Sequence, residues 1–174
     1  MSHHAAYRAA GQAVAALWYG APIAYADLGG AVIRWPGLPA LRYRERGQVL
    51  AEIAIRMAGV AALGRYGFGG PATSRWYVVT WRFYPSDLVD LAEAWRMVKI
   101  VDPAGDDDLF FRAWCSALDF IAQDSVWESV ETVAAELERR QIDGATVERI
   151  ADRAYGRPED PAAGPLGATG VWSP

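Results

Sequence analysis

The chain has 174 residues and a mass of 19.0 kDa; 52% of its residues are apolar, and 17 basic and 21 acidic side chains give a formal charge of −4. This length and composition predict one globular domain with an apolar core. Lys99 is the only lysine and the sequence has no basic stripe, which argues against nucleic acid and against anionic membrane surfaces as partners.

The first third of the chain predicts two helices separated by a small β unit. Apolar spacing indicates a helix over residues 5–19, which Gly20 and Pro22 end. Short β-rich pieces at 23–28 and 31–35 follow, and they form either a hairpin or a pair of edge strands. A second long helix is expected over 45–63.

The rest of the chain predicts further helices. Four glycines and a proline in Gly64–Pro71 predict a loop. The aromatic, β-branched run Trp76–Tyr84 is compatible with a strand or with a buried helix or loop segment. A helix follows with Ser86 as its N-cap and continues to Lys99. Three more helices are expected, over 108–123, 126–140 and 146–155.

The expected architecture is therefore mainly α with a small β-hairpin or edge sheet, an α+β fold. One domain spans residues 1–154. Residues 155–174 are rich in proline and glycine and predict a flexible tail, in which Trp172 either docks on the domain or a partner or stays in water.

One segment near the N-terminus carries a resemblance to a known family. The run Ala6-Tyr7-Arg8-Ala9-Ala10-Gly11-Gln12-Ala13-Val14 resembles the zinc-binding helix of the FtsH-type AAA+ metalloproteases, Ala-Tyr-His-Glu-Ala-Gly-His-Ala-Val. The family's motif is His-Glu-x-x-His, in which two histidines one helical turn apart hold zinc and the glutamate acts as general base. In this chain the same positions read Arg8-Ala9-Ala10-Gly11-Gln12.

Further segments resemble the family in the same order along the chain. Met57-Ala58-Gly59-Val60-Ala61-Ala62 is similar to an Ala-Gly-x-Ala-Ala segment of the family's second helix. Pro85-Ser86-Asp87-Leu88 resembles the Ser-Asp-Leu segment that supplies the third zinc ligand, which by position gives that role to Asp87. Residues 133–138 and 142–147 resemble the closing helix and its Leu-Asp-Gly turn. The resemblance implies an FtsH-type peptidase fold over most of residues 5–150.

The substitutions remove the chemistry of the motif. A protonated arginine has no lone pair for a metal, and the neutral amide oxygen of Gln12 is a poor zinc ligand. Ala9 replaces the general base. We therefore expect no bound metal, no cofactor and no protease activity, unless His3 or His4 folds back to complete a site.

What replaced the metal is a separate hypothesis. If the fold is kept, Arg8 and Asp87 approach each other, and the guanidinium occupies the place of the zinc and pairs with the carboxylate. The alternative is that Asp87 only caps its helix or stays solvated.

Two functions fit this interpretation. The first is a non-proteolytic binding or regulatory module that has kept a cleft lined by Arg8, Gln12 and Asp87 and by the aromatic side chains of Trp76, Trp81 and Tyr84. The second is a repurposed enzyme that acts on a small molecule in that cleft without a metal. The partner is a protein or a small molecule that the sequence does not identify, and a homo-oligomer is compatible with both functions.

The remaining signals favour a cytoplasmic protein, and they favour structural roles over catalytic or metal-binding roles for Cys115 and Asp106–Asp108. A single cysteine, Cys115, excludes an internal disulfide and fits a reducing compartment. The apolar stretch Ala13–Ala26 imitates a secretion signal, but Gly20 and Pro22 interrupt it. Cys115 lies beside Trp114 without a histidine nearby, so we expect a packed thiol rather than a nucleophile. Asp106–Asp108 resembles a metal-binding run, but capping of the next helix explains it better.

Overall fold

A computed structural model describes residues 2–34, 46–68, 85–103 and 108–154. The side chains of Ser2, Phe68, residues 85–88 and Asp108 are outside the description. Several predictions lie in the remaining segments. They are the run Trp76–Tyr84 with Trp76, Trp81 and Tyr84, the acidic pair Asp106 and Asp107, and the tail with Trp172.

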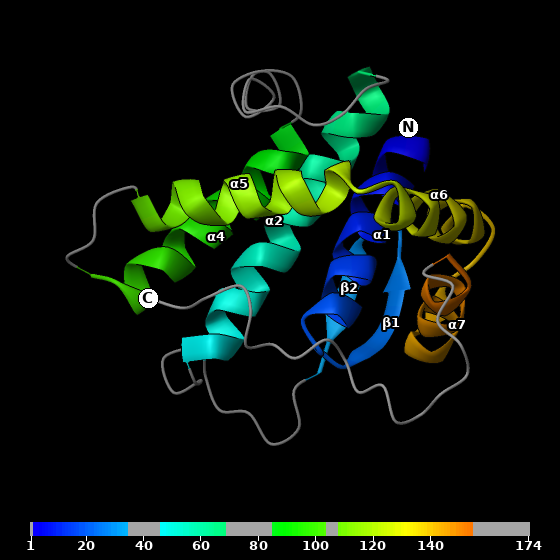
Figure 1. The fold of residues 1–174 in the computed structure, drawn as a ribbon, viewed down its shortest axis with the longest axis horizontal. Coiled ribbons are helices and arrows are strands. Elements are labelled where there is room, and N and C mark those ends of the chain that lie inside the picture. Colours follow the sequence, from blue (N-terminus) through cyan, green and yellow to red (C-terminus); the bar gives the residue numbers. More distant parts are fainter. Residues whose placement is uncertain (1, 35–45, 69–84, 104–107, 155–174) are drawn as a thin grey trace.

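The described part of the chain is mainly helical with a small three-stranded antiparallel sheet, which confirms the predicted α+β class (Figure 1). In chain order the elements are α1 (Ser2–Trp18), β1 (Ile23–Asp27), β2 (Gly30–Ile33), α2 (Arg46–Phe68), α4 (Pro85–Val101), α5 (Asp108–Ala122), α6 (Asp124–Leu137), β3 (Ile142–Asp143) and α7 (Gly144–Ala154).

Helix α1 is the element around which the others are arranged. Its alanine-rich sequence favours a helix, and Ala6, Ala9, Ala10 and Ala13 are fully buried. Gly20 adopts a positive φ of 66° just past the end of the helix, and the Ala21 amide donates back to the Ala16 carbonyl. This left-handed cap explains why the chain turns sharply from α1 into β1.

Helix α2 crosses α1 and also packs against α4 and α5. The prediction of a loop from Gly64 is wrong, because α2 continues to Phe68. Gly64 is buried, and the Arg65 guanidinium donates to the Ile121 carbonyl at 2.6 Å, so tertiary contacts hold a last turn that glycine disfavours. The segment Arg46–Gly67 of α2 is long and apolar enough to cross a membrane. However, 72% of its apolar 18-residue stretch is buried inside the structure, as is usual for a core helix.

The sheet has the order β2-β1-β3. The predicted hairpin of β1 and β2 is present, with Ala26 opposite Ala31 and Asp27 opposite Gly30. The third strand, β3, was not predicted. It consists of two residues: Asp143 pairs with Tyr25 of β1, and Ile142 pairs with Ala26 of β1. Two residues are too few to show the alternating apolar pattern that predicts a strand.

Helix α4 begins at Pro85, so Ser86 lies inside the first turn and not at the predicted N-cap position. Proline fits the first turn because its missing amide hydrogen would have no partner there. From there α4 runs beside α2, which places its buried residues Asp90, Leu91 and Ala94 against the centre of the fold.

Candidate functional site

Two glycines allow α1 and α2 to approach closely. A Cβ atom on Gly11 would lie 2.5 Å from the Cβ of Ala62 and 2.7 Å from the carbonyl oxygen of Ala58. A Cβ atom on Gly59 would lie 2.9 Å from the Arg8 carbonyl oxygen. Because real Cβ contacts are not that short, both positions require glycine at this separation of the helices.

Three side chains converge on the carboxylate of Asp90 in α4, whose side chain is only 6% exposed. Its Oδ2 atom accepts hydrogen bonds from Arg8 Nη1 at 3.0 Å and from Gln12 Nε2 at 2.9 Å. Its Oδ1 atom accepts a hydrogen bond from Arg56 Nη1 in α2 at 3.2 Å. We call Arg8, Gln12, Arg56 and Asp90 the Asp90 cluster.

The Asp90 cluster also holds the β-hairpin. The second nitrogen of the Arg8 guanidinium donates to the Gly29 carbonyl at 2.9 Å, and Gln12 Oε1 accepts from the Ala31 amide at 3.2 Å. Gly30 has a φ of 133°, and a Cβ atom there would lie 2.6 Å from Gln12 Oε1. Both ends of the Gln12 amide are therefore used, one on α4 and one on β2.

This arrangement suits a structural network better than a reaction centre. Two guanidinium groups and an amide occupy the carboxylate, so its lone pairs are engaged in charge-assisted bonds. Arginine and glutamine do not replace histidine as zinc ligands. Ala9, at the position of the family's general base, is fully buried. Among the described residues, no three His, Cys, Asp or Glu side chains gather as a metal site would require.

The structure brings together two of the residues predicted for the site. Arg8 and Gln12 lie one turn apart on α1 and bind the same carboxylate, that of Asp90. The predicted partner of Arg8 was Asp87, whose side chain is outside the described residues; Asp90 lies three residues further along the same helix. The aromatic residues predicted for the cleft, Trp76, Trp81 and Tyr84, are also outside them.

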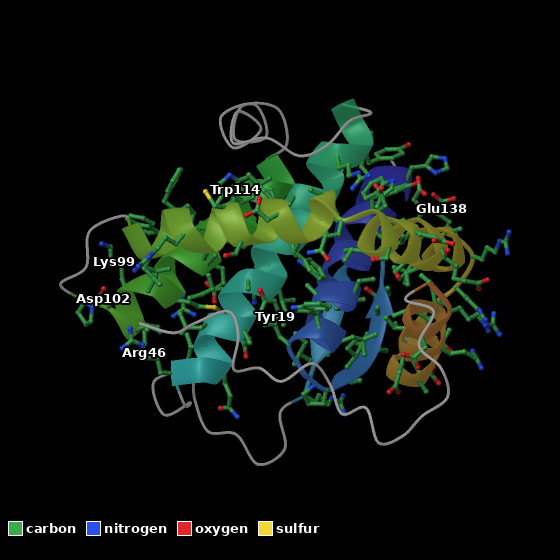
Figure 2. The ribbon with its side chains drawn as sticks, in the orientation of Figure 1. Tyr19, Arg46, Lys99, Asp102, Trp114 and Glu138 are labelled. Carbon is green, nitrogen blue, oxygen red and sulfur yellow. The ribbon has the colours of Figure 1, made fainter. Side chains whose placement is uncertain are left out.

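The two histidines have other partners. His3 Nδ1 is hydrogen-bonded to the carboxylate of Glu138, which follows the end of α6 (Figure 2). The ring of His4 meets that of Tyr66 edge-on, at 5.5 Å between centroids.

Sequence reasoning missed Asp90 and Arg56. A signal was present for each. Asp90 follows Asp87 at a spacing that puts both on one face of a helix, and Arg56 interrupts an apolar helix between Ile53 and Met57. A charge inside a buried helix calls for a partner of opposite charge, and α4 provides it.

A small pocket adjoins the Asp90 cluster, between the sheet and α2. It has a volume of about 220 Å³ and is lined by Gln12, Ala31, Ile33, Glu52, Ile55 and Arg56. Small-molecule sites usually measure roughly 300–1,000 Å³. The pocket is therefore smaller than a typical small-molecule site.

Cys115 does not resemble a nucleophile. It is half-buried in α5, and burial together with the charge of Asp119 raises the pKa of its thiol. A raised pKa lowers the fraction of thiolate, which is the reactive form.

Comparison of the chain with protein families, with curated proteins and with solved structures finds no match in any of the three.

Proposed function

We propose that this chain is a degenerate relative of the FtsH-type peptidase domain and acts as a non-proteolytic binding or regulatory module. The observation that carries the proposal is the Asp90 cluster. Arg8 and Gln12 stand at the positions of the two histidines in the family's pattern, and both bind the carboxylate of Asp90 in α4. The resemblance assigns the third metal ligand of the family to this same helix. A guanidinium held by a carboxylate is a physically reasonable substitute for a metal ion in a buried polar site.

The small residues that match the family's pattern, apart from the lost ligands and base, support the proposal through packing. Gly11 belongs to the first similar segment, and Ala58, Gly59 and Ala62 belong to the second. They meet at the close crossing of α1 and α2. Small residues at these positions have a packing role that does not depend on zinc, so they would persist after the loss of catalysis.

The small pocket beside the Asp90 cluster supports binding over catalysis. Strand β2 lies at one end of the strand order, and Ala31 and Ile33 line the pocket. Edge strands can accept an extended segment of another protein as an additional strand, with a side chain in an adjoining pocket. We therefore infer a protein segment as the partner of this cleft.

The first experiment measures metal content and stability. Untagged protein purified without added metal is analysed for elements, and its melting temperature is recorded with Zn²⁺ and with a chelator. We expect less than stoichiometric metal, no shift with either reagent and no hydrolysis of casein. Stoichiometric zinc that stabilises the fold would contradict the proposal.

A second experiment tests the family relationship by restoring ligands. The double variant Arg8→His/Gln12→His places two imidazoles one turn apart on α1, next to the carboxylate of Asp90. If the scaffold is that of a zinc peptidase, the variant gains a rise of several degrees in melting temperature with Zn²⁺, since a ligand that binds only the folded state stabilises it. The single variant Arg8→His is the matched control. A double variant that folds but ignores zinc would contradict the relationship.

The alternative function, a metal-free enzyme, rests on the polar lining of the same pocket. Gln12, Glu52 and Arg56 line it, and polar groups that converge in a pocket are what acid–base chemistry requires. Under this alternative a small molecule would be converted, and Glu52→Gln would lower kcat for that reaction. Under the binding proposal the same variant changes the affinity for a partner segment.

A further inference from the structure

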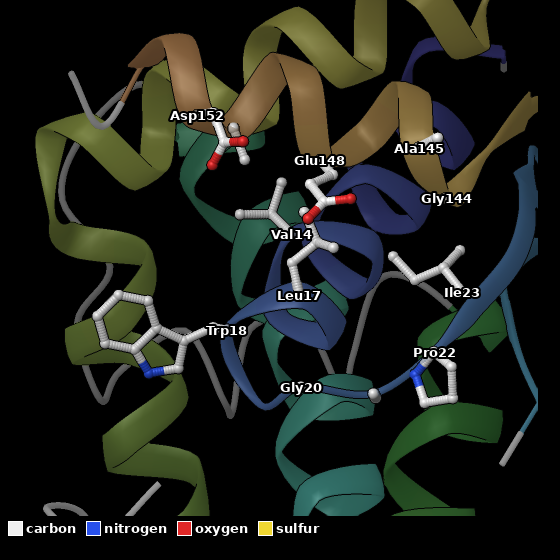
Figure 3. Close-up of a pocket in the computed structure, with 12 residues that line it drawn as sticks. Val14, Leu17, Trp18, Gly20, Pro22, Ile23, Gly144, Ala145, Glu148 and Asp152 are labelled. Atoms are coloured by element: carbon white, nitrogen blue, oxygen red, sulfur yellow. The ribbon is translucent and has the colours of Figure 1, made fainter. Parts of the chain in front are cut away.

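Whereas the Asp90 cluster includes residues in the middle of α1, a larger cavity lies at the C-terminal end of that helix. It has a volume of about 460 Å³, within the range of small-molecule sites, and opens between the end of α1, the start of β1 and α7 (Figure 3). Its apolar lining includes Val14, Leu17, Trp18, Pro22 and Ile23. We call it the α1–α7 cavity.

Two carboxylates line the α7 side of this cavity. Glu148 and Asp152 are four residues apart and therefore share one face of α7, and Figure 3 shows their carboxyl groups on the side that faces α1. Both side chains are exposed, and neither forms a hydrogen bond or an ion pair with any described residue. Among the described residues that line the cavity there is no Arg, Lys or His.

The C-terminal end of α1 closes one side of the cavity. The helix ends at Trp18, and Gly20 and Ala21 at its C-terminal cap also line the cavity. Its last carbonyl groups already accept hydrogen bonds from the amides of Tyr19, Gly20 and Ala21. The negative potential over the apolar floor therefore comes from the two carboxylates, and an indole ring can stabilise a cation further.

We propose that the α1–α7 cavity is a binding site for a small organic cation, an ammonium group on an apolar body. The apolar part would lie against Val14, Leu17 and Ile23, and the ammonium group would lie between the carboxylates of Glu148 and Asp152. The proposal is independent of the function proposed for the Asp90 cluster, because the two sites share no lining residue.

The test uses three probes of the same size and different charge. Titration calorimetry with the full chain measures binding of 3-phenylpropylammonium, of neutral 3-phenylpropanol and of anionic 3-phenylpropanoate. We expect the ammonium to bind at least about tenfold more tightly than the alcohol, a difference of about 1.4 kcal/mol, and the anion not to bind. Added salt should weaken the binding of the ammonium only.

Substitutions in α7 test whether Glu148 and Asp152 cause the preference for the ammonium. Glu148→Gln/Asp152→Asn removes both charges without a change in side-chain size and should reduce ammonium affinity to that of the alcohol. The matched control, Glu128→Gln/Glu131→Gln, removes two exposed carboxylates of α6 that do not line the cavity and should leave affinity unchanged. Ala145→Phe, at an exposed lining position, should block all binding while the protein stays folded.

Three results would overturn the proposal. They are equal affinity for the ammonium and the alcohol, no binding of any probe by well-folded protein, and an equal loss in the α6 control. None of them affects the zinc and stability tests of the Asp90 cluster.

Discussion

Polar side chains have opposite roles at the middle of α1 and at its C-terminal end. In the middle of the helix, Arg8 and Gln12 donate hydrogen bonds to Asp90 and are also hydrogen-bonded to the hairpin, and the glycines Gly11 and Gly59 bring the helices into close contact. Near its C-terminal end, Glu148 and Asp152 face a cavity of about 460 Å³ and bind no described residue. Buried groups that are fully hydrogen-bonded indicate a structural role. Exposed carboxylates at the edge of an apolar cavity are accessible to a cationic ligand, which is the basis of the binding proposal.

The largest effect is expected where the helices are closest. Gly11→Val would place methyl groups inside the contacts with Ala58 and Ala62 and force α1 away from α2. We expect a loss of about 3–5 kcal/mol in the free energy of unfolding, or failure to fold. Urea denaturation measures the loss.

Gly47→Ala is the control for this substitution. Gly47 lies in α2, and nothing comes within 4 Å of a Cβ atom placed there. Alanine should be neutral or should stabilise the helix by up to about 1 kcal/mol. If Gly11→Val is as harmless as the control, the contrast between the tightly packed middle of α1 and its open C-terminal end is wrong.

The next effect tests whether the Asp90 cluster is structural. Asp90→Asn keeps the shape of the side chain but leaves Arg8 and Arg56 without the charge that balances them. We expect a loss of about 2–3 kcal/mol, again by urea denaturation. In a double-mutant cycle, Arg8→Met and Asp90→Asn should cost clearly less together than the sum of the two single changes.

The same cycle with Asp87→Asn in place of Asp90→Asn tests the pairing that the sequence suggested. We expect coupling of Arg8 to Asp90 and little coupling to Asp87. The reverse result would move the centre of the site one turn toward the start of α4. Additive effects in both cycles would show that the cluster does not hold the helices together.

The sequence predicts the secondary-structure elements better than it predicts the tertiary contacts between them. The helix at the N-terminus, the hairpin and the mainly helical class follow from apolar spacing and from Gly20 and Pro22, which are local signals. The end of α2 and strand β3 depend on partners far along the chain, such as the Ile121 carbonyl for Arg65 and Tyr25 for Asp143. Local patterns do not contain those partners.

The site shows the same division. Arg8 and Gln12 could be selected as site residues because the segment around them resembles the zinc-binding helix of the FtsH-type metalloproteases. Both take part in the Asp90 cluster. Asp90 and Arg56 could be found only by asking which charge neutralises an arginine inside an apolar helix. The α1–α7 cavity could not be predicted, because it lies between elements that are more than a hundred residues apart in the chain.

The smallest effect concerns the helix that bears the cavity's carboxylates. Asp143 precedes α7, and its carboxylate accepts a hydrogen bond from the Thr146 amide at 2.9 Å. Hydrogen bonds from the Thr146 side chain and amide hold the pKa of Asp143 below its usual range. A lowered pKa in the folded state gives stability that is present above the ordinary carboxyl pKa and is lost as the pH falls through the lowered one.

Asp143→Ala should therefore lower the melting temperature by a few degrees at pH 7, and the difference from the parent protein should shrink as the pH falls below about 4. Asp152→Asn is the matched control on the same helix: its carboxylate has no described partner, so its removal should leave the melting temperature nearly unchanged at every pH. A loss for Asp152→Asn as large as that for Asp143→Ala would mean that Asp152 already stabilises the fold. The carboxylates near the C-terminal end of α1 would then be structural, like Asp90, and the contrast between the middle of the helix and that end would disappear.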